Sequence, residues 1–266
     1  MTNWTIKAKI YRFIQNFFED DTTYFAASLS FYTIFALFPI LALLVAVFSA
    51  TPFFAYNLDI FLSYILHILN PANSEQFENF AKEFLLGTEN LGTIGLLYSI
   101  FVFTMFFKDY ERVVNKICKT KSSGFYKSIF FYIGFIILAP LIFAIFVFAI
   151  SFANSTIFVN FITFIFAWIL LIAIFKISIH RQVYTSSIVI TTFFTLIFLA
   201  LSQNLFLKYA SINSTYGTIY GSFSIAMLFF LWIYINWTIY LYGILFAFKL
   251  TLYMKAKKLF GNKIKR

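Results

Sequence analysis

The sequence contains few charged residues. Asp, Glu, Lys and Arg together make up 11% of its 266 residues, whereas 62% of the residues are hydrophobic. Soluble domains carry roughly 25% charged and about 45–50% apolar residues. This composition excludes a globular cytosolic protein and indicates a polytopic α-helical membrane protein, because a helix satisfies its own backbone hydrogen bonds within a bilayer.

Cysteine and histidine are scarce as well. The single cysteine, Cys118, has no partner for an internal disulfide, and it lies in a basic segment that we expect in the cytosol, where thiols stay reduced. The two histidines, His67 and His180, have no further His, Cys or carboxylate at the spacing that metal ligands use. The sequence therefore predicts no metal site.

Glycine-rich phosphate-binding loops are missing too. The sequence has neither a GxxxxGK[ST] nor a GxGxxG motif, so we expect no bound nucleotide and no other cofactor. Metal-assisted phosphodiester hydrolysis needs clustered histidines and carboxylates, but the ten acidic residues fall in the segment 51–90 and at the inner ends of predicted helices. Because no catalytic constellation is found, we predict that the chain is not an enzyme.

The most informative segment that is present is residues 22–50, which carry no charge and exceed the roughly 20 residues that a helix needs to cross a bilayer. Within it, Ala26, Ser30 and Thr33 follow a helical spacing, which gives one face of small and hydroxylated residues that suits helix packing. Pro39 lacks the N–H that would bond the carbonyl four residues earlier, so we expect a kink in the middle of the membrane.

Five further apolar segments complete a predicted bundle of six transmembrane helices. The fold class that we expect is all-α, a polytopic membrane bundle with interfacial or amphipathic helices beside it. The predicted spans are residues 22–50, 91–107, 129–152, 157–175, 184–207 and 223–248. Together with their links they form one membrane domain, residues 22–253.

Three segments flank or interrupt the predicted spans. Residues 1–21 interleave aromatic and aliphatic residues with Lys and Arg, which suits a helix on the inner headgroups or, equally, a helix packed on cytosolic loops. Residues 51–90 hold an apolar stretch that is too short to cross and then an amphipathic pattern, so we place them at the outer surface. Residues 254–266 form a basic cytosolic tail, for which we expect anionic lipid headgroups as partners.

The basic residues are distributed unevenly among the predicted loops. Eighteen of the 20 Lys and Arg residues lie in the two tails and in the links after the second and fourth spans, which places both termini in the cytosol. Because these residues flank spans rather than line one folded face, membrane lipids explain the net charge of +10, and nucleic acid is not an expected partner. The sequence identifies no protein partner.

Three motifs resemble those of a known family. The acidic pair at residues 20–21 is followed by AASLSFYTIFALFPI, Glu111 and Asn115 occur in DYERVVNKI, and residues 219–243 read IYGSFSIAMLFFLWIYINWTIYLYG. In this order the motifs are similar to the signatures of the YihY/BrkB family of bacterial inner-membrane proteins. The resemblance implies a multi-pass protein of the bacterial inner membrane. An older label of that family is tRNA-processing ribonuclease. The histidines and carboxylates of this sequence are scattered, which disfavours such an activity.

Polar and small residues inside the predicted spans are the candidates for a site. We read those of the first, fifth and sixth spans as the wall of one interior groove for a lipid or other amphiphile. The alternative is that they only hold helices together, in a structural or assembly partner without transport activity. The candidates are Ser28, Ser30, Thr33, Pro39, Thr191, Thr195, Ser202, Gln203, Asn204, Gly221, Asn236 and Gly243.

Charged and amide residues allow further expectations. Adjacent helix positions point about 100° apart, so only one of Gln203 and Asn204 can face a shared interior. No acidic or basic residue lies deep in a predicted span, which disfavours a proton relay.

The acidic pair at residues 20–21, and Asp21 in particular, is the candidate cap of the first span. Glu111, Arg112 and Asn115 are candidates for ion pairs with one another or with that acidic pair, or for a solvated charged face.

The predicted orientation can be tested with reporter fusions. A phosphatase that is active only outside the cytosol should work when it is fused after Lys82, because that residue lies in the predicted outer segment. The same reporter fused after Lys255 should be inactive, because it would remain in the cytosol. The reverse pattern of activity would contradict the topology.

Overall fold

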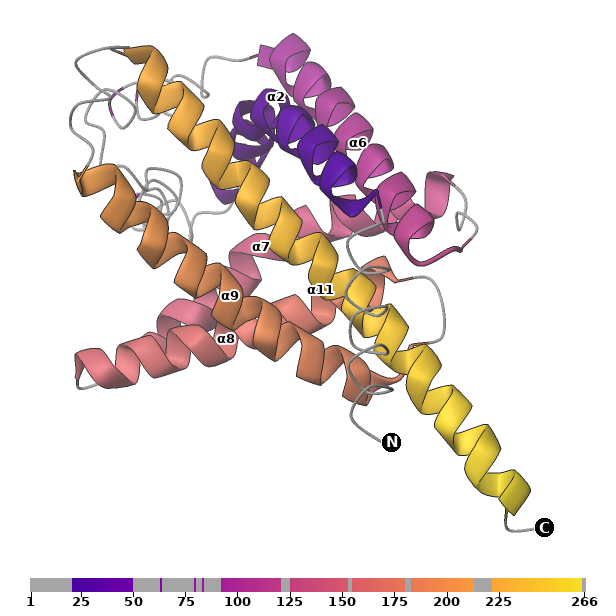
Figure 1. The fold of residues 1–266 in the computed structure, drawn as a ribbon. Helices are drawn as coiled ribbons and strands as arrows, with labels where there is room; N and C mark the ends of the chain where they lie inside the picture. The colour runs from indigo at the N-terminus through magenta and orange to yellow at the C-terminus, as the bar shows by residue number, and fades with distance from the viewer. Residues whose placement is uncertain are drawn as a thin grey trace.

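A computed structural model describes residues 21–49, 92–120, 125–152, 155–179, 183–212 and 222–264, together with residues 63, 79 and 83. The described residues form six long α-helices and no strand (Figure 1). The helices are α2 (Thr22–Ser49), α6 (Gly92–Ile117), α7 (Phe125–Ser151), α8 (Thr156–Ser178), α9 (Thr185–Ile212) and α11 (Ser222–Ile264). The all-α bundle that the composition predicts is therefore confirmed. The predictions for residues 1–20, for most of residues 51–90, for both histidines and for Gly221 lie outside the described residues.

Four of the described helices contain a segment with the length and composition of a membrane span. The helix α7 is apolar from Ile129 to its end, and α6 becomes polar from Lys108 onward. Large side chains such as Ile94 and Ile157 are 84% and 81% exposed, which suits contact with lipid rather than with water. Among the described residues, the segments long and apolar enough to cross a bilayer are Thr22–Val47, Thr156–Ser178, Thr185–Phe206 and Met227–Lys257.

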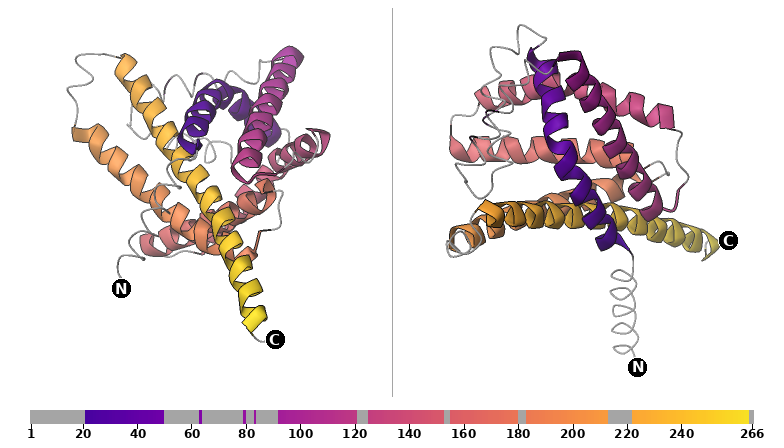
Figure 2. Two further views of the ribbon diagram at one scale, coloured as in Figure 1. Left: turned by 45° about the vertical axis from the view of Figure 1, so that its right-hand side comes forward. Right: turned by 90° about the horizontal axis from the view of Figure 1, so that it is seen from above.

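The helix α11 connects the two halves of the bundle. It is 43 residues long, and it packs against α2 and α9, which Figure 1 shows on either side of it. Farther out, α6 packs against α2 and α8 packs against α9, while α7 contacts α2, α6 and α8 (Figure 2). The centre of the bundle is therefore the place where α2, α9 and α11 meet.

Contacts near the helix ends show which ends lie together. Lys116, in the last turn of α6, places its ammonium 5.4 Å from the ring centre of Phe25 at the start of α2. Ser187, at the start of α9, donates a hydrogen bond of 3.3 Å to the sulfur of Met254 in the late part of α11. A pair of hydroxyl groups joins α6 and α8 near their ends. The starts of α2 and α9 thus gather with the ends of α6 and α8 and the late part of α11.

The helix α2 runs through Pro39 without interruption. The left-hand view of Figure 2 shows it curving along its length, so the expected kink takes the form of a bend in a continuous helix. Before the proline, Ser30 Oγ donates to the Ala26 carbonyl and Thr33 Oγ1 donates to the Leu29 carbonyl, each over 2.6 Å. Hydroxyls that bond the preceding turn are satisfied without another helix, and they also favour bending.

The helices α8, α9 and α11 meet closely at Gly243. This glycine is buried, and a methyl group built on its α-carbon would overlap Thr195 Oγ1 of α9 and lie 3.1 Å from Phe175 Cζ of α8. Phe175 and its neighbour Leu241 are themselves completely buried. A small residue at this position allows the backbones to approach, as in other membrane helix pairs.

The close approach at Gly243 can be tested with alanine. Gly243→Ala should lower the free energy of unfolding by about 1–3 kcal/mol because it overpacks the contact with Thr195. Gly134→Ala in α7 is the matched control, since nothing lies within 4 Å of the added methyl group. That control should be neutral or slightly stabilising, because alanine favours a helix more than glycine does.

Chemical unfolding in detergent, followed by circular dichroism, measures both changes. Combining Gly243→Ala with Thr195→Ala should recover most of the lost stability, because the second change removes the atoms that clash. Equal stability of the Gly243 and Gly134 variants would contradict the packing described here.

Candidate functional site

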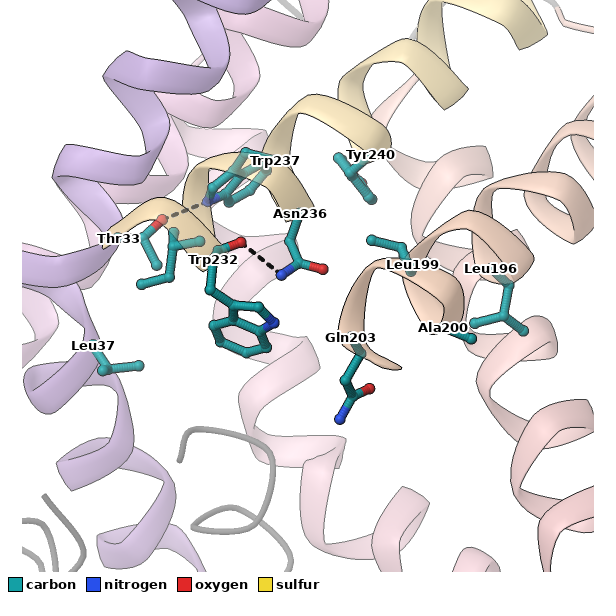
Figure 3. Close-up of a pocket in the computed structure, with 11 residues that line it drawn as sticks. Thr33, Leu37, Leu196, Leu199, Ala200, Gln203, Trp232, Asn236, Trp237 and Tyr240 are labelled. Atoms are coloured by element: carbon teal, nitrogen blue, oxygen red, sulfur yellow. Dashed lines mark hydrogen bonds between the residues drawn. The ribbon is translucent and has the colours of Figure 1, made fainter. Parts of the chain in front are cut away.

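A cavity lies where α2, α9 and α11 meet, and we call it the central cavity (Figure 3). Its volume is about 450 Å³, which falls within the range of small-molecule sites. The described residues that line it are Thr33, Leu37, Leu196, Leu199, Ala200, Gln203, Trp232, Ile233, Asn236, Trp237 and Tyr240. None of these residues is charged, and most are apolar, so the cavity suits a ligand with a hydrocarbon part.

Regular helical spacing explains how each helix contributes its wall. Trp232, Asn236 and Tyr240 recur every four residues along α11, so they lie on one face of that helix. On α9, Ala200 and Gln203 stand three residues apart and share a face in the same way. The first, fifth and sixth predicted spans therefore surround a common space.

Polar groups at the cavity are tied to its walls. Thr33 Oγ1 accepts a hydrogen bond of 2.7 Å from the indole N–H of Trp237, which fastens α2 to α11. Asn236 Nδ2 donates to the carbonyl oxygen of Trp232 over 2.7 Å. Figure 3 shows the other end of the Asn236 amide turned toward α9, with the amide of Gln203 on the same side of the cavity. Both amides are therefore available to a polar ligand group.

A cluster of hydroxyl groups supports the wall of the cavity from behind. The buried Tyr110 of α6 donates a hydrogen bond of 2.7 Å to Ser178 Oγ of α8, and its hydroxyl also bonds that of Tyr240 in α11. The ring of Tyr240 packs edge-on against Phe175 and against Trp237, with ring centres 5.2 and 5.5 Å apart. Three helices are thus held together at one residue of the cavity wall.

A second cavity lies between α9 and α11, on another face of these helices, and its volume is about 500 Å³. Its threonine hydroxyls do not point to a polar ligand: Thr191 Oγ1 donates to the Ser187 carbonyl and Thr195 Oγ1 donates to the Thr191 carbonyl, each over 2.8 Å. The described residues that line it are Thr191, Phe194, Thr195, Phe198, Thr238, Ile239, Tyr242, Gly243 and Phe246.

The structure divides the candidate groove residues between several environments. Thr33, Gln203 and Asn236 line the central cavity, whereas Thr191, Thr195 and Gly243 line the second one. Ser30 is buried, and its hydroxyl donates to a carbonyl of its own helix. The other candidates in the described part of the chain line neither cavity. These other candidates are Ser28, Pro39, Ser202 and Asn204.

Gln203 and Asn204 are separated by the geometry of α9. Gln203 is half-buried and lines the central cavity, whereas Asn204 is exposed on the outside of the helix and lines neither cavity. The two neighbouring amides therefore provide a test position and a matched control.

Two of the candidates that the sequence places on the cytosolic side are Asp21 and Arg112. Asp21 precedes α2, and its carbonyl oxygen accepts the first hydrogen bond of that helix, from Phe25. Arg112 forms an exposed ion pair of 2.8 Å with Asp109, one turn away on α6. Such a pair contributes little to stability in water. Whether the carboxylate of Asp21 also caps the helix stays a prediction.

Glu111 and Asn115 are buried at the end of α6, 6% exposed each. Asn115 donates to the Glu111 carboxylate over 3.4 Å and accepts from the hydroxyl of Thr120 over 2.7 Å. The backbone N–H of Thr120 also bonds the Asn115 carbonyl, while Lys119 adopts a left-handed φ of 51°. This is the hydrogen-bond pattern of a Schellman cap, so these residues end the helix.

The candidates predicted from the sequence do not include the aromatic residues of α11. Trp232 and Tyr240 both line the central cavity. The sequence does contain a signal for this arrangement. Trp232 lies four residues before Asn236 and Tyr240 lies four residues after it, so a helix places the amide between two aromatic rings on one face.

The described residues contain no group of three His, Cys, Asp or Glu side chains that could hold a metal ion. The chemistry that the central cavity offers is therefore hydrocarbon contact together with neutral hydrogen-bonding groups.

Comparisons with known proteins identify relatives of this chain. A family model described as Virulence factor BrkB matches residues 13–264. A protein called UPF0761 membrane protein from Legionella pneumophila (strain Corby) is 27% identical over 268 residues, which cover 91% of this chain and 63% of the relative. One with the same name from Pseudoalteromonas atlantica is 23% identical over 261 residues, which cover 91% of this chain and 86% of the relative.

These comparisons describe a membrane protein without naming an activity. The chain spans about three fifths of the length of the Legionella relatives that it matches, 63% of one and 58% of another. No solved structure matches the chain. The name of the relatives states their place in a membrane and no enzymatic reaction.

The hydroxyl cluster can be tested with a phenylalanine substitution. Tyr110→Phe removes the hydroxyl that bonds both Ser178 and Tyr240, so it should lower the free energy of unfolding in detergent by about 1 kcal/mol. Tyr98→Phe on the same helix is the control, because Tyr98 is 62% exposed. A loss of stability that is no larger for Tyr110→Phe than for Tyr98→Phe would show that the cluster does not hold the helices.

Proposed function

We propose that this chain, which belongs to the BrkB family of membrane proteins, uses its central cavity as a groove or pathway for a lipid or other amphiphile. The observation that carries the proposal is the open cavity of about 450 Å³ that residues of α2, α9 and α11 line. An apolar pocket with a few convergent polar groups is the usual form of a binding site.

The lining matches the two parts of an amphiphile. Leu37, Leu196 and Leu199 offer hydrocarbon contacts from α2 and α9, which suit an acyl chain. Gln203 and Asn236 provide amides that can donate and accept hydrogen bonds, which suit a polar group attached to such a chain. Because the helices have the composition of membrane spans, lipid is the ligand that such a cavity meets at high concentration.

The lining also limits how movement of a ligand could be driven. The described residues of the cavity wall include no Asp, Glu, Lys, Arg or His. A proton or sodium relay usually needs an ionisable group inside the membrane. Movement through the groove would therefore be uncoupled or driven by a partner protein.

The proposed setting is the bacterial inner membrane, with both termini in the cytosol. Support comes from the clustering of helix ends described above, which places the start of α2 near the late part of α11. Lys255 and Lys257 are exposed in that late part, where they can meet anionic headgroups. Basic residues of this kind favour the cytosolic side.

A structural or assembly role is the second candidate. It is supported by hydrogen bonds that join helices without any ligand, such as the bond of 3.1 Å from the Trp168 indole to Thr192 Oγ1. If this role is correct, lipid in the central cavity serves no function, and the polar residues of the cavity do not determine which lipid binds there.

The neighbouring amides of α9 distinguish the two candidates. Gln203→Leu, alone or with Asn236→Leu, should lower the amount of lipid retained by the purified protein about three- to tenfold, because the polar part of the ligand loses hydrogen bonds. Asn204→Leu should leave retention unchanged, because Asn204 faces away from the cavity. Native mass spectrometry measures the retained lipid, and passage of a fluorescent amphiphile in reconstituted vesicles measures transport.

Both measurements apply to protein that elutes as a single folded species. If retention and passage are the same in the wild type, in Gln203→Leu with Asn236→Leu and in Asn204→Leu, the groove is not used and the structural role stands. If Asn204→Leu has the larger effect, the cavity is not the place where the lipid binds.

A further inference from the structure

Two tryptophans of α11 line the central cavity, and their indole N–H groups differ. The N–H of Trp237 donates to Thr33 Oγ1 over 2.7 Å. The N–H of Trp232 is buried and has no hydrogen-bond partner among the described residues. A buried donor without an acceptor costs free energy, so such groups are rare in native proteins and often mark a place where something else binds.

The nitrogen of Trp232 lies beside the polar part of the cavity. Figure 3 shows it on the edge of the ring that faces the region between Asn236 and Gln203. The indole itself lines the cavity. An acceptor that entered the cavity would then complete the only bond that this donor can make.

The position of Trp232 along α11 indicates which acceptor it meets. The residue lies ten positions after Ser222, where α11 begins, which corresponds to about 15 Å along the helix axis. The cavity wall around it is hydrocarbon with a few neutral polar groups, so an acceptor that reaches the indole must belong to a molecule that enters with an apolar chain. The ester carbonyls of a glycerolipid are neutral acceptors joined directly to such chains.

The charge of the lining agrees with a neutral acceptor. A phosphate or a fatty-acid carboxylate held inside the cavity would need a cation, and the described lining has none. An ester carbonyl accepts a hydrogen bond without bringing a charge. Its acyl chain can lie along Leu37 and Leu199, which line the cavity.

We infer that the indole N–H of Trp232 donates a hydrogen bond to the ester carbonyl of a glycerolipid whose acyl chain occupies the central cavity. This inference rests on the proposed groove and adds the chemical group that the groove recognises. Trp232 is thus a specificity residue that distinguishes ester-linked from ether-linked lipids.

The test compares two phosphatidylethanolamines with identical headgroups and chain lengths, one ester-linked and one ether-linked. The full-length protein is stripped of lipid by detergent exchange and titrated with each lipid, and the bound fraction is measured by native mass spectrometry. The wild type should bind the ester lipid about three- to tenfold more tightly, because only the ester offers a carbonyl to the indole.

The matched variants are Trp232→Phe and Trp168→Phe. Trp232→Phe keeps an aromatic ring but lacks the N–H, so it should bind both lipids equally. Trp168→Phe should keep the ester preference, because Trp168 donates to Thr192 and does not line the central cavity.

Each outcome has a distinct meaning. A wild type that binds both lipids equally, or an ester preference that persists in Trp232→Phe, overturns the role of Trp232 and leaves the groove standing. A wild type that binds neither lipid overturns the groove and this inference together. The wild-type comparison needs no substitution, so equal binding of the two lipids overturns the role of Trp232 even if Trp232→Phe does not fold.

Discussion

Inside a bilayer, a polar group has no water to bond with, so each one must find its partner within the protein or in a ligand. This constraint explains most of the polar contacts in the chain. Ser30, Thr33, Thr191 and Thr195 donate to the carbonyl one turn earlier in their own helix. The expectation that hydroxyls at this depth serve either as links between helices or as the wall of a pathway overlooks this third solution. A hydroxyl that donates within its own helix can still accept a bond from another one, as Thr33 does from Trp237.

The polar groups that do reach beyond their own helix define the architecture. The bond from Trp237 to Thr33 fastens α2 to α11, and the cluster of Tyr110, Ser178 and Tyr240 fastens α6 and α8 to the same helix. The close contact at Gly243 then sets the spacing of α9. Since α2 and α9 both pack against α11, the central cavity is bounded by contacts that fix its walls independently of any ligand.

Composition and periodicity were sufficient to predict the class of the fold and the family. A chain with 11% charged residues and long apolar runs must be a membrane helix bundle, and the motifs around Glu111 and within residues 219–243 pointed to the family that the comparisons confirm. The helix α8, Thr156–Ser178, closely follows the predicted span 157–175. The helix α11 continues to Ile264, through residues interpreted as a separate tail, because Lys, Ala and Leu are good helix formers.

The register between helices could not be predicted from the sequence. That Gln203 faces the central cavity and Asn204 faces outward depends on how α9 is rotated against α11. The polar residues of α9 are spread around the helix, so they form no amphipathic stripe from which that rotation could be predicted. The unpartnered N–H of Trp232 is likewise invisible in the sequence, where Trp232 and Trp237 look equivalent. Both depend on which side chains from distant segments come together.

The central claim is that the space between α2, α9 and α11 holds part of a lipid. Electron cryomicroscopy of the protein in nanodiscs made from ester-linked lipid, with a bound antibody fragment to add mass, tests it most directly. We predict elongated density between Leu37 and Leu199, ending in a branched feature next to Trp232. A map in which side chains close this space, with ordered lipid only on the outer surface of the bundle, would contradict the account.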